Sequence, residues 1–236
     1  RERDLTGAAL SDLDLSGLDL ERALLEGADL SGCNLAGANL AGAVLTRAKL
    51  ARADLRGAKL VGANLAAATL SDAKLAGADL TDAKLDGVTL TGIDMAKCRL
   101  SGVSLQQAEL RGARWAGCVG EGLTLVELDA SGADFRGADL SRCTFVEATL
   151  DDADLREATL TKGLFYKCSG KDVRFDKAQA KGFLAVNASS FPRARFTGAC
   201  LDEAHLRGTS LAEANLDGAA MASADLSSCD LSGASL

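Results

Sequence analysis

The sequence predicts an all-β fold, a solenoid in which the chain winds as a right-handed quadrilateral parallel β-helix of about 12 coils of about 20 residues each. Two observations lead to this fold class. Leucine occupies every fifth position from Leu5 to Leu110, with Met95 as the exception, and the residue two places before it is nearly always small. Glycine often follows two places after the leucine, for example at Gly27 and Gly37.

The period of five residues is incompatible with an α-helix. Successive leucines would lie about 140° apart around a helix and would form no apolar stripe. As an extended segment, Ala-Asp-Leu at residues 28–30 alternates inward, outward and inward, and Ser31-Gly32 forms a turn. Each repeat is therefore one side plus one corner, and four sides close one coil.

The corner glycines explain how the chain turns. A type II turn requires a positive φ at its third residue, which glycine adopts without steric cost. We expect this role for glycines such as Gly7, Gly17, Gly57 and Gly77. Because parallel crossover connections are right-handed, we expect right-handed winding, and coils stacked about 4.8 Å apart would form a rod about 55 Å long.

Several repeats carry a resemblance to a known family, including Ala-Asp-Leu-Ser-Gly at residues 28–32, Ala-Asn-Leu-Ala-Gly at 38–42 and Ala-Asp-Phe-Arg-Gly at 133–137. The chain resembles the pentapeptide repeat proteins over essentially its whole length, which implies their right-handed quadrilateral β-helix. The opening run at residues 13–20, Leu-Asp-Leu-Ser-Gly-Leu-Asp-Leu, is also similar to pentapeptide segments of proteins associated with type VI secretion.

We expect one β-helical domain over residues 1–236, regular over 4–114, irregular over 115–192 and regular again over 193–236. The frame of the repeat shifts by one residue near 186–190, which predicts a bulge or small loop there. The chain begins without Met and ends on a leucine of the core pattern. We therefore expect a fragment of a larger protein, with a flanking domain or an end-to-end second copy covering the open coils.

The cysteines and the single histidine indicate no catalytic or metal site. His205 falls in an outward column, and no Cys-x-x-Cys pair is present. Cys200 also points outward, whereas the other six cysteines fall in the small inward column: Cys33, Cys98, Cys118, Cys143, Cys168 and Cys229. We expect no enzyme activity, no cofactor and no bound metal.

Charge reverses within the irregular section. Residues 121–160 carry ten carboxylates against three arginines, and residues 161–195 carry eight cations against two carboxylates. The acidic band comprises Glu127, Asp129, Asp134, Asp139, Asp151, Asp152 and Asp154. The basic section, which also holds several Phe, predicts a partner surface of Lys162, Tyr166, Lys167, Lys171, Arg174, Lys177, Lys181, Arg193 and Arg195. The alternative interpretation is an imperfect coil whose core is repacked with Phe.

The predicted function is a non-catalytic structural and protein-interaction module, a rigid rod-like scaffold within a larger bacterial protein associated with secretion. No apolar run is long enough to cross a membrane, so we expect a cytoplasmic protein or one exported by a specialised secretion system. The net charge of −7 disfavours direct binding of nucleic acid.

The alternative, implied by the resemblance, is a DNA mimic that binds DNA gyrase and protects or inhibits it. A mimic must present a continuous negative stripe to the basic DNA groove of its target. Outward residues 20 positions apart instead alternate in sign, as in Asp54, Lys74, Asp94 and Arg114. The sequence therefore favours the scaffold over the mimic.

Overall fold

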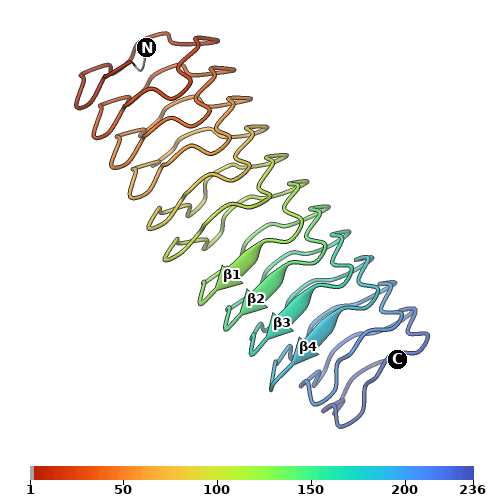
Figure 1. The fold of residues 1–236 in the computed structure, drawn as a ribbon. Helices are drawn as coiled ribbons and strands as arrows, with labels where there is room; N and C mark the ends of the chain where they lie inside the picture. The colour runs from red at the N-terminus through yellow and green to blue at the C-terminus, as the bar shows by residue number, and fades with distance from the viewer. Residues whose placement is uncertain (1–2) are drawn as a thin grey trace. The chain divides into compact units, whose positions relative to one another are not determined.

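The computed structural model describes residues 3–236 and divides into two compact units, Arg1–Arg114 and Trp115–Leu236, called here the N-terminal and C-terminal units (Figure 1). Each unit is a right-handed parallel β-helix with four-sided coils. Within each unit, residues twenty positions apart form parallel bridges, such as Asn34 with Asp54 and Asp134 with Asp154. Residues 3–236 contain no helix with the length and hydropathy needed to cross a bilayer.

Each side of a coil is a short extended segment hydrogen-bonded to the coils before and after it. The N–H of Leu30 donates to the carbonyl of Lys49 at 2.8 Å, and the N–H of Lys49 donates to the carbonyl of Ala28 at 2.9 Å. Because a corner interrupts the ladder every five residues, most sides pair through a single bridge. The backbone of one coil thus places the next coil directly above it.

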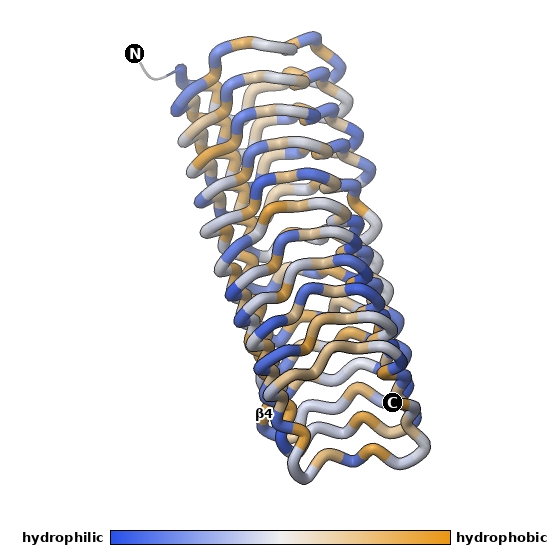
Figure 2. The backbone as a smooth tube through the Cα atoms, turned by 90° about the vertical axis from the view of Figure 1, so that its right-hand side faces the viewer, coloured by the Kyte–Doolittle hydropathy of each residue, from blue (hydrophilic) through white to orange (hydrophobic). Residues whose placement is uncertain are grey.

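The core consists of the two inward side chains of each repeat. Ala28 and Leu30 are fully buried, and so are Ala48 and Leu50 one coil later. Figure 2 shows hydrophobic positions recurring in step from coil to coil. Each buried leucine contributes on the order of 1.5 to 3 kcal/mol, so the stacked leucines supply much of the stability of each unit.

The corners adopt the left-handed conformation that the glycine pattern predicts. Gly32 has a φ of 68°, and the N–H of Cys33 donates to the carbonyl of Leu30 at 3.1 Å, which closes a type II turn. Non-glycine residues take the same position in many repeats, for example Arg47 at φ 57° and Ala67 at φ 56°. The fold therefore forces a backbone conformation that costs L-residues roughly 1–2 kcal/mol each.

One side of the C-terminal unit forms longer strands than the rest. These are β1 (Thr124–Val126), β2 (Thr144–Val146), β3 (Leu164–Tyr166) and β4 (Leu184–Val186), paired in parallel in that order. Each strand extends into the corner that follows it, where Val126, Val146, Tyr166 and Val186 stand. Valine or tyrosine stands at this extra position in all four strands, and both residue types fit extended backbone.

The register lengthens by one residue after β4, in the segment where the sequence changes frame. Val186 pairs with Tyr166, twenty residues earlier, but Ser190 pairs with Ser169, twenty-one residues earlier. The extra residue is accommodated by two consecutive positive φ angles, 54° at Asn187 and 62° at Ala188. Beyond it, Ser190 pairs with Ser210 and the twenty-residue register resumes.

Ser189 stabilises this insertion from inside the coil. Its side chain is buried, and its Oγ lies 2.8 Å from the carbonyl oxygen of Val186 and 3.1 Å from that of Phe165. The same oxygen accepts the N–H of Cys168 at 3.2 Å. The serine therefore satisfies backbone groups that the changed register leaves without their usual partners.

The phenylalanines of the C-terminal unit are core residues. Phe145 and Phe165 lie with ring centroids 4.4 Å apart, and Phe183 packs edge-on against Phe165 at 4.9 Å. Phe175 stacks on Phe196 at 4.6 Å. Because these rings are buried, the Phe-rich section is a repacked core, and any partner must contact the residues between them.

Replacing Leu40, which is fully buried, by Ala is expected to lower the free energy of unfolding by about 2–5 kcal/mol, because the coils above and below hold the cavity open. Leu24→Ala is the matched control, since Leu24 points outward and is only half-buried. Urea denaturation measures both. An equal loss in the two variants would contradict the inward and outward assignment.

Replacing Ala67 by Gly is expected to raise the free energy of unfolding by up to about 1 kcal/mol, because glycine adopts the φ of 56° without the penalty of a Cβ atom. The reverse change, Gly57→Ala, is expected to destabilise. A Cβ at Gly57 meets no atom within 4 Å, so its effect isolates the backbone penalty. Thermal unfolding of both variants tests the pair, and a stabilising Gly57→Ala would contradict this account.

Candidate interaction surfaces

The outward residue of each side frequently bonds to its own corner. Asp29 Oδ1 accepts the backbone N–H of Ser31 at 3.1 Å, and Asn34 Oδ1 accepts that of Ala36 at 3.2 Å. Hydrogen bonds from the Ser31 side chain and then from its backbone N–H hold the pKa of Asp29 below its usual value. Such carboxylates stabilise turns and are not gathered around a reaction centre.

Seven charged residues of the C-terminal unit form two neighbouring columns, called here the Arg–Asp columns: Asp134, Arg136, Asp154, Arg156, Arg174, Asp176 and Arg195. Arg136 Nε donates to Asp134 Oδ1 at 2.8 Å, and Arg156 makes the same contact with Asp154 at 2.8 Å. The order then inverts. Arg174 and Arg195 both lie against Asp176, at 3.9 Å and 3.3 Å.

The Arg–Asp columns bring together two members of the predicted acidic band and two of the predicted partner surface. Asp154 bridges to Asp134 on one side and to Arg174 on the other, and Arg174 bridges to Arg195. A hollow of about 320 Å³ lies beside them, and Arg156, Arg174 and Arg195 contribute to its lining. Arg174 Nε and Asp176 Oδ2 are buried there without a hydrogen-bond partner.

The rest of the predicted partner surface encircles the C-terminal unit. Lys162, Lys167, Lys171 and Lys177 occupy four successive corners of one coil. Some of the basic side chains have acidic neighbours, including one of these four lysines. Lys167 Nζ lies 2.9 Å from Glu147 and 5.4 Å from the ring centroid of Tyr166, which ends β3.

Two further basic residues pair across adjacent coils. Lys181 Nζ lies 3.1 Å from Glu203, and Arg193 pairs with Asp172.

The remaining acidic band is also spread over several sides. Its members are Glu127 directly after β1, Asp129 bridged to Thr149, Asp139 bridged to Thr159, and the corner residues Asp151 and Asp152, of which Asp151 accepts the N–H of Lys171.

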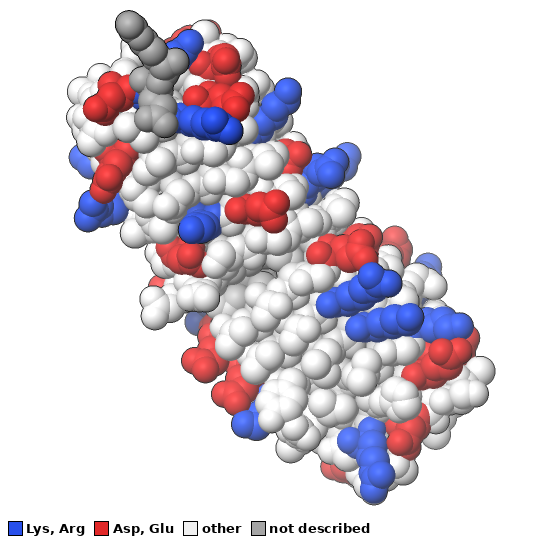
Figure 3. Space-filling view, in the orientation of Figure 1, with Lys and Arg blue, Asp and Glu red and all other residues white. Residues whose placement is uncertain are grey.

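Sequence reasoning missed an uncharged face in the same unit. The outward side chains of β1–β4, called here the apolar face, are Thr124, Val126, Thr144, Val146, Leu164, Tyr166, Leu184 and Val186. Figure 3 shows this face as a white surface with charged side chains along both edges. The available signal was the apolar residue at the first corner position, which most other repeats fill with Ala, Ser, Thr or Asp.

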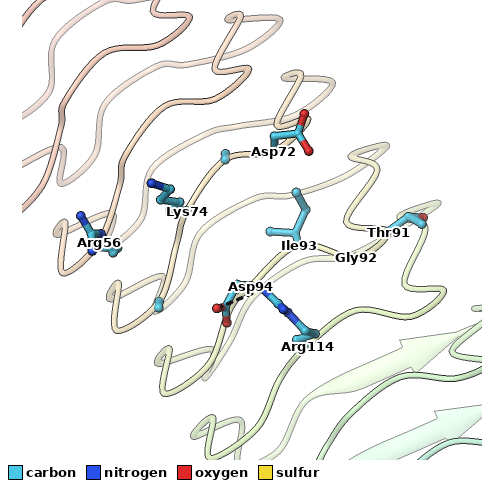
Figure 4. A pocket seen from close by; sticks show the side chains of 10 residues that line it. Arg56, Asp72, Lys74, Thr91, Gly92, Ile93, Asp94 and Arg114 are labelled. Atoms are coloured by element: carbon cyan, nitrogen blue, oxygen red, sulfur yellow. Dashed lines mark ion pairs between the residues drawn. The ribbon is translucent and has the colours of Figure 1, made fainter.

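The N-terminal unit contains a different irregularity, a hollow of about 550 Å³ lined by Arg56, Asp72, Lys74, Ile93, Asp94 and Arg114, among others (Figure 4). Lys49 pairs with Thr69 and Thr89 pairs with Glu109, but among the described residues of this side Thr69 and Thr89 do not pair with each other.

Two larger side chains of the small column lie beside this hollow. Val88 and Ile93 are buried where Ala is usual, directly after Ala68 and Ala73 of the preceding coil. Added volume in a packed column disfavours close stacking, in keeping with the missing bridge between Thr69 and Thr89. Asp72 and Lys74 at its edge are exposed, and Arg114 pairs with Asp94 at 3.2 Å. The hollow is thus a solvent-exposed break in the ladder, with its charges largely balanced.

Burial makes two of the thiols of the C-terminal unit poor nucleophiles. Desolvation raises the pKa of Cys143 to about 12 and that of Cys168 to about 11. Within residues 3–236 no disulfide joins any of the seven cysteines, and Cys200 and Cys229 are only partly buried. Within residues 3–236, no cluster of three or more His, Cys, Asp or Glu side chains is placed to hold a metal ion.

A family model for pentapeptide repeats matches the chain in eight copies, and the matched residues include 4–40, 23–62, 63–102, 98–137, 125–161, 189–227 and 199–236. The chain therefore belongs to the pentapeptide repeat family. No curated protein matches it.

Solved structures of other pentapeptide repeat proteins are similar to this chain. HetL from the cyanobacterium Nostoc sp. strain PCC 7120, involved in heterocyst differentiation regulation, is 28% identical, with 96% of this chain and 91% of HetL covered and a TM-score of 0.39. QnrB1, a plasmid-mediated fluoroquinolone resistance protein, is 21% identical, with 77% and 90% covered and a TM-score of 0.36. Rfr23 from the cyanobacterium Cyanothece 51142 is 18% identical, with 64% and 89% covered and a TM-score of 0.26.

The pairing of Asp134 with Arg136 is expected to make stability depend on acid pH. The side-chain hydrogen bond from Arg136 holds the pKa of Asp134 below its usual value, so its contribution is present above about pH 4 and is lost as the pH falls through the lowered pKa. Asp134→Asn should therefore lower the melting temperature at pH 7 and match the parent chain near pH 2. Asp82→Asn, at an exposed corner, is the control; a pH-independent difference for Asp134→Asn would refute the assignment.

Proposed function

We propose that this pentapeptide repeat protein is a non-catalytic scaffold that presents ordered surface side chains to protein partners, as a module of a larger bacterial protein. The observation that supports it most is the direction of the pKa shifts. In the described residues, the shifted aspartates lie below their usual pKa, and the shifted lysines, arginines and thiols lie above theirs.

These shifts disfavour acid–base chemistry. A general acid or base works best with a pKa near the operating pH, which requires an aspartate pKa to rise or a lysine pKa to fall. The contact between Arg136 and Asp134 moves both pKa values away from neutral pH, because it lowers the pKa of the carboxyl and raises that of the guanidinium. Charges that stay ionised in this way suit recognition of a partner better than proton transfer.

The interleaving of opposite charges supports partner recognition over structural filling alone. Fixed charges at defined positions steer encounters and reject unsuitable partners. The secretion association stays part of this proposal and rests on the resemblance of residues 13–20. End-to-end packing with a second copy or a flanking domain also stays part of this proposal.

A DNA mimic that binds gyrase is the second candidate, and the net charge of −7 is the observation that favours it. The Arg–Asp columns argue against it, because Asp134 and Asp154 are each neutralised by an arginine two residues later. A mimic would require these carboxylates to face the basic groove of the enzyme without such partners.

A gyrase supercoiling assay separates the two candidates. The purified chain at micromolar concentration is expected to leave supercoiling unchanged, because its carboxylates form no continuous negative stripe. Affinity capture from a bacterial lysate should recover protein in a stoichiometric amount. Inhibition of supercoiling would overturn the scaffold in favour of the mimic, and recovery of nucleic acid alone would overturn both.

A further inference from the structure

The apolar face of the C-terminal unit is unusual for an outward side. Its four strands carry Thr and Val, Thr and Val, Leu and Tyr, then Leu and Val, with no charged side chain among them. The corresponding side of the N-terminal unit is interrupted by Asn64 and Lys84. Val126 is 45% exposed, and Leu164 and Leu184 are only half-buried. Covering such a face removes apolar surface from water and is favourable.

The charged edges of this face change sign along the stack of coils (Figure 3). The edge after the strands carries Glu127, Glu147, Lys167 and Asn187, and the edge before them carries Glu121, Arg142, Lys162 and Lys181. Acidic residues thus lie on both sides of β1, β2 has Arg142 on one side and Glu147 on the other, and cations predominate beside β3 and β4. The change from acidic residues over 121–160 to basic residues over 161–195 therefore also occurs along the edges of the apolar face.

We propose that two copies of this chain associate through the apolar face, side by side and antiparallel, about a two-fold axis that lies between β2 and β3 and runs parallel to the strands. This operation places β1 over β4 of the second copy and β2 over β3. A two-fold interface repeats every contact twice, so each complementary pair counts double.

Charge complementarity selects this occupant and this orientation. Glu147 faces Lys167 of the second copy along one edge, and Glu121 faces Lys181 of the second copy along the other. Arg142 faces Lys162 of the second copy, which is the one like-charged pair of this arrangement. Within each chain Arg142 lies 3.5 Å from Glu121, Lys167 lies 2.9 Å from Glu147 and Lys181 lies 3.1 Å from Glu203, so the contacts between copies extend existing ion pairs. Opposite charges across the edges of an interface favour encounter in the matching register.

The parallel arrangement is disfavoured by the same charges. A two-fold axis along the stack would place Lys167 opposite Lys162 and Glu127 opposite Glu121. Both pairs are like-charged, and only Glu147 opposite Arg142 would attract. The antiparallel pair therefore has the better electrostatic match.

The interface is small, which determines how the dimer should behave. Four strands about 4.8 Å apart, with their edges, offer about 400 Å² per copy, roughly half of what a stable complex buries on each side. We expect an association in the micromolar range or weaker that depends on protein concentration. Added salt should weaken it further, because the edge pairs are solvent-exposed.

Sedimentation equilibrium of the full chain and its charge variants tests this dimer. Glu147→Lys and Lys167→Glu should each weaken self-association about tenfold, because each creates a like-charged contact twice. A mixture of the two variants should regain the parent affinity, since the lysine introduced at position 147 would then face the glutamate introduced at position 167 across the interface. An effect confined to one chain, such as loss of the 2.9 Å contact between Glu147 and Lys167, cannot produce this recovery on mixing.

Matched controls come from another corner of the same unit. Asp172 and Arg193 also pair across adjacent coils at similar exposure, so Asp172→Lys and Arg193→Glu should leave self-association unchanged. Leu164→Asp should abolish the dimer while far-UV circular dichroism shows an intact fold, because Leu164 points outward. Three results would overturn the proposal. The parent chain could stay monomeric at high concentration, or the two charge variants could fail to regain affinity on mixing. The dimer could also survive Leu164→Asp, which would indicate end-to-end packing.

Discussion

The register of twenty residues between stacked coils is the constraint on which the rest of each unit depends. Because backbone hydrogen bonds place Lys49 directly above Asp29, side chains twenty positions apart become neighbours whatever lies between them. Inward positions must then interdigitate with copies of themselves, which suits Leu on Leu and Ala on Ala. Outward side chains one coil apart also become neighbours, and opposite charges are favourable there, as in the pair of Asp94 with Arg114.

Departures from the repeat show how tightly this constraint acts. Val88 and Ile93 add methyl groups to the small column, and the ladder between Thr69 and Thr89 is lost beside them. One added residue near Ala188 is tolerated only with two consecutive positive φ angles and a buried serine hydroxyl. Volume and chain length are therefore limited locally, while the stack on either side continues unchanged.

The fold could be predicted from the sequence because leucines at a fixed spacing along the chain become leucines stacked on one another in the core. The candidate surfaces could be predicted only in part, because charge was counted along the chain. Lys162, Lys167, Lys171 and Lys177 look like one cluster in the sequence, but successive corners direct them to four different edges. The apolar face, conversely, is assembled from residues twenty positions apart, so that Val146 and Val186 never appear together in a local stretch.

The inverted order in the Arg–Asp columns follows from the same stacking rule. Asp134 and Asp154 are like charges one coil apart, and each is compensated within its own repeat by an arginine two residues later. A third such repeat would lengthen both like-charged columns. Placing Arg174 after Asp154, and Asp176 after Arg156, instead brings opposite charges together in both columns at once. Sequence changes that look arbitrary within one pentapeptide thus have an electrostatic reason, which is seen when residues twenty positions apart are compared.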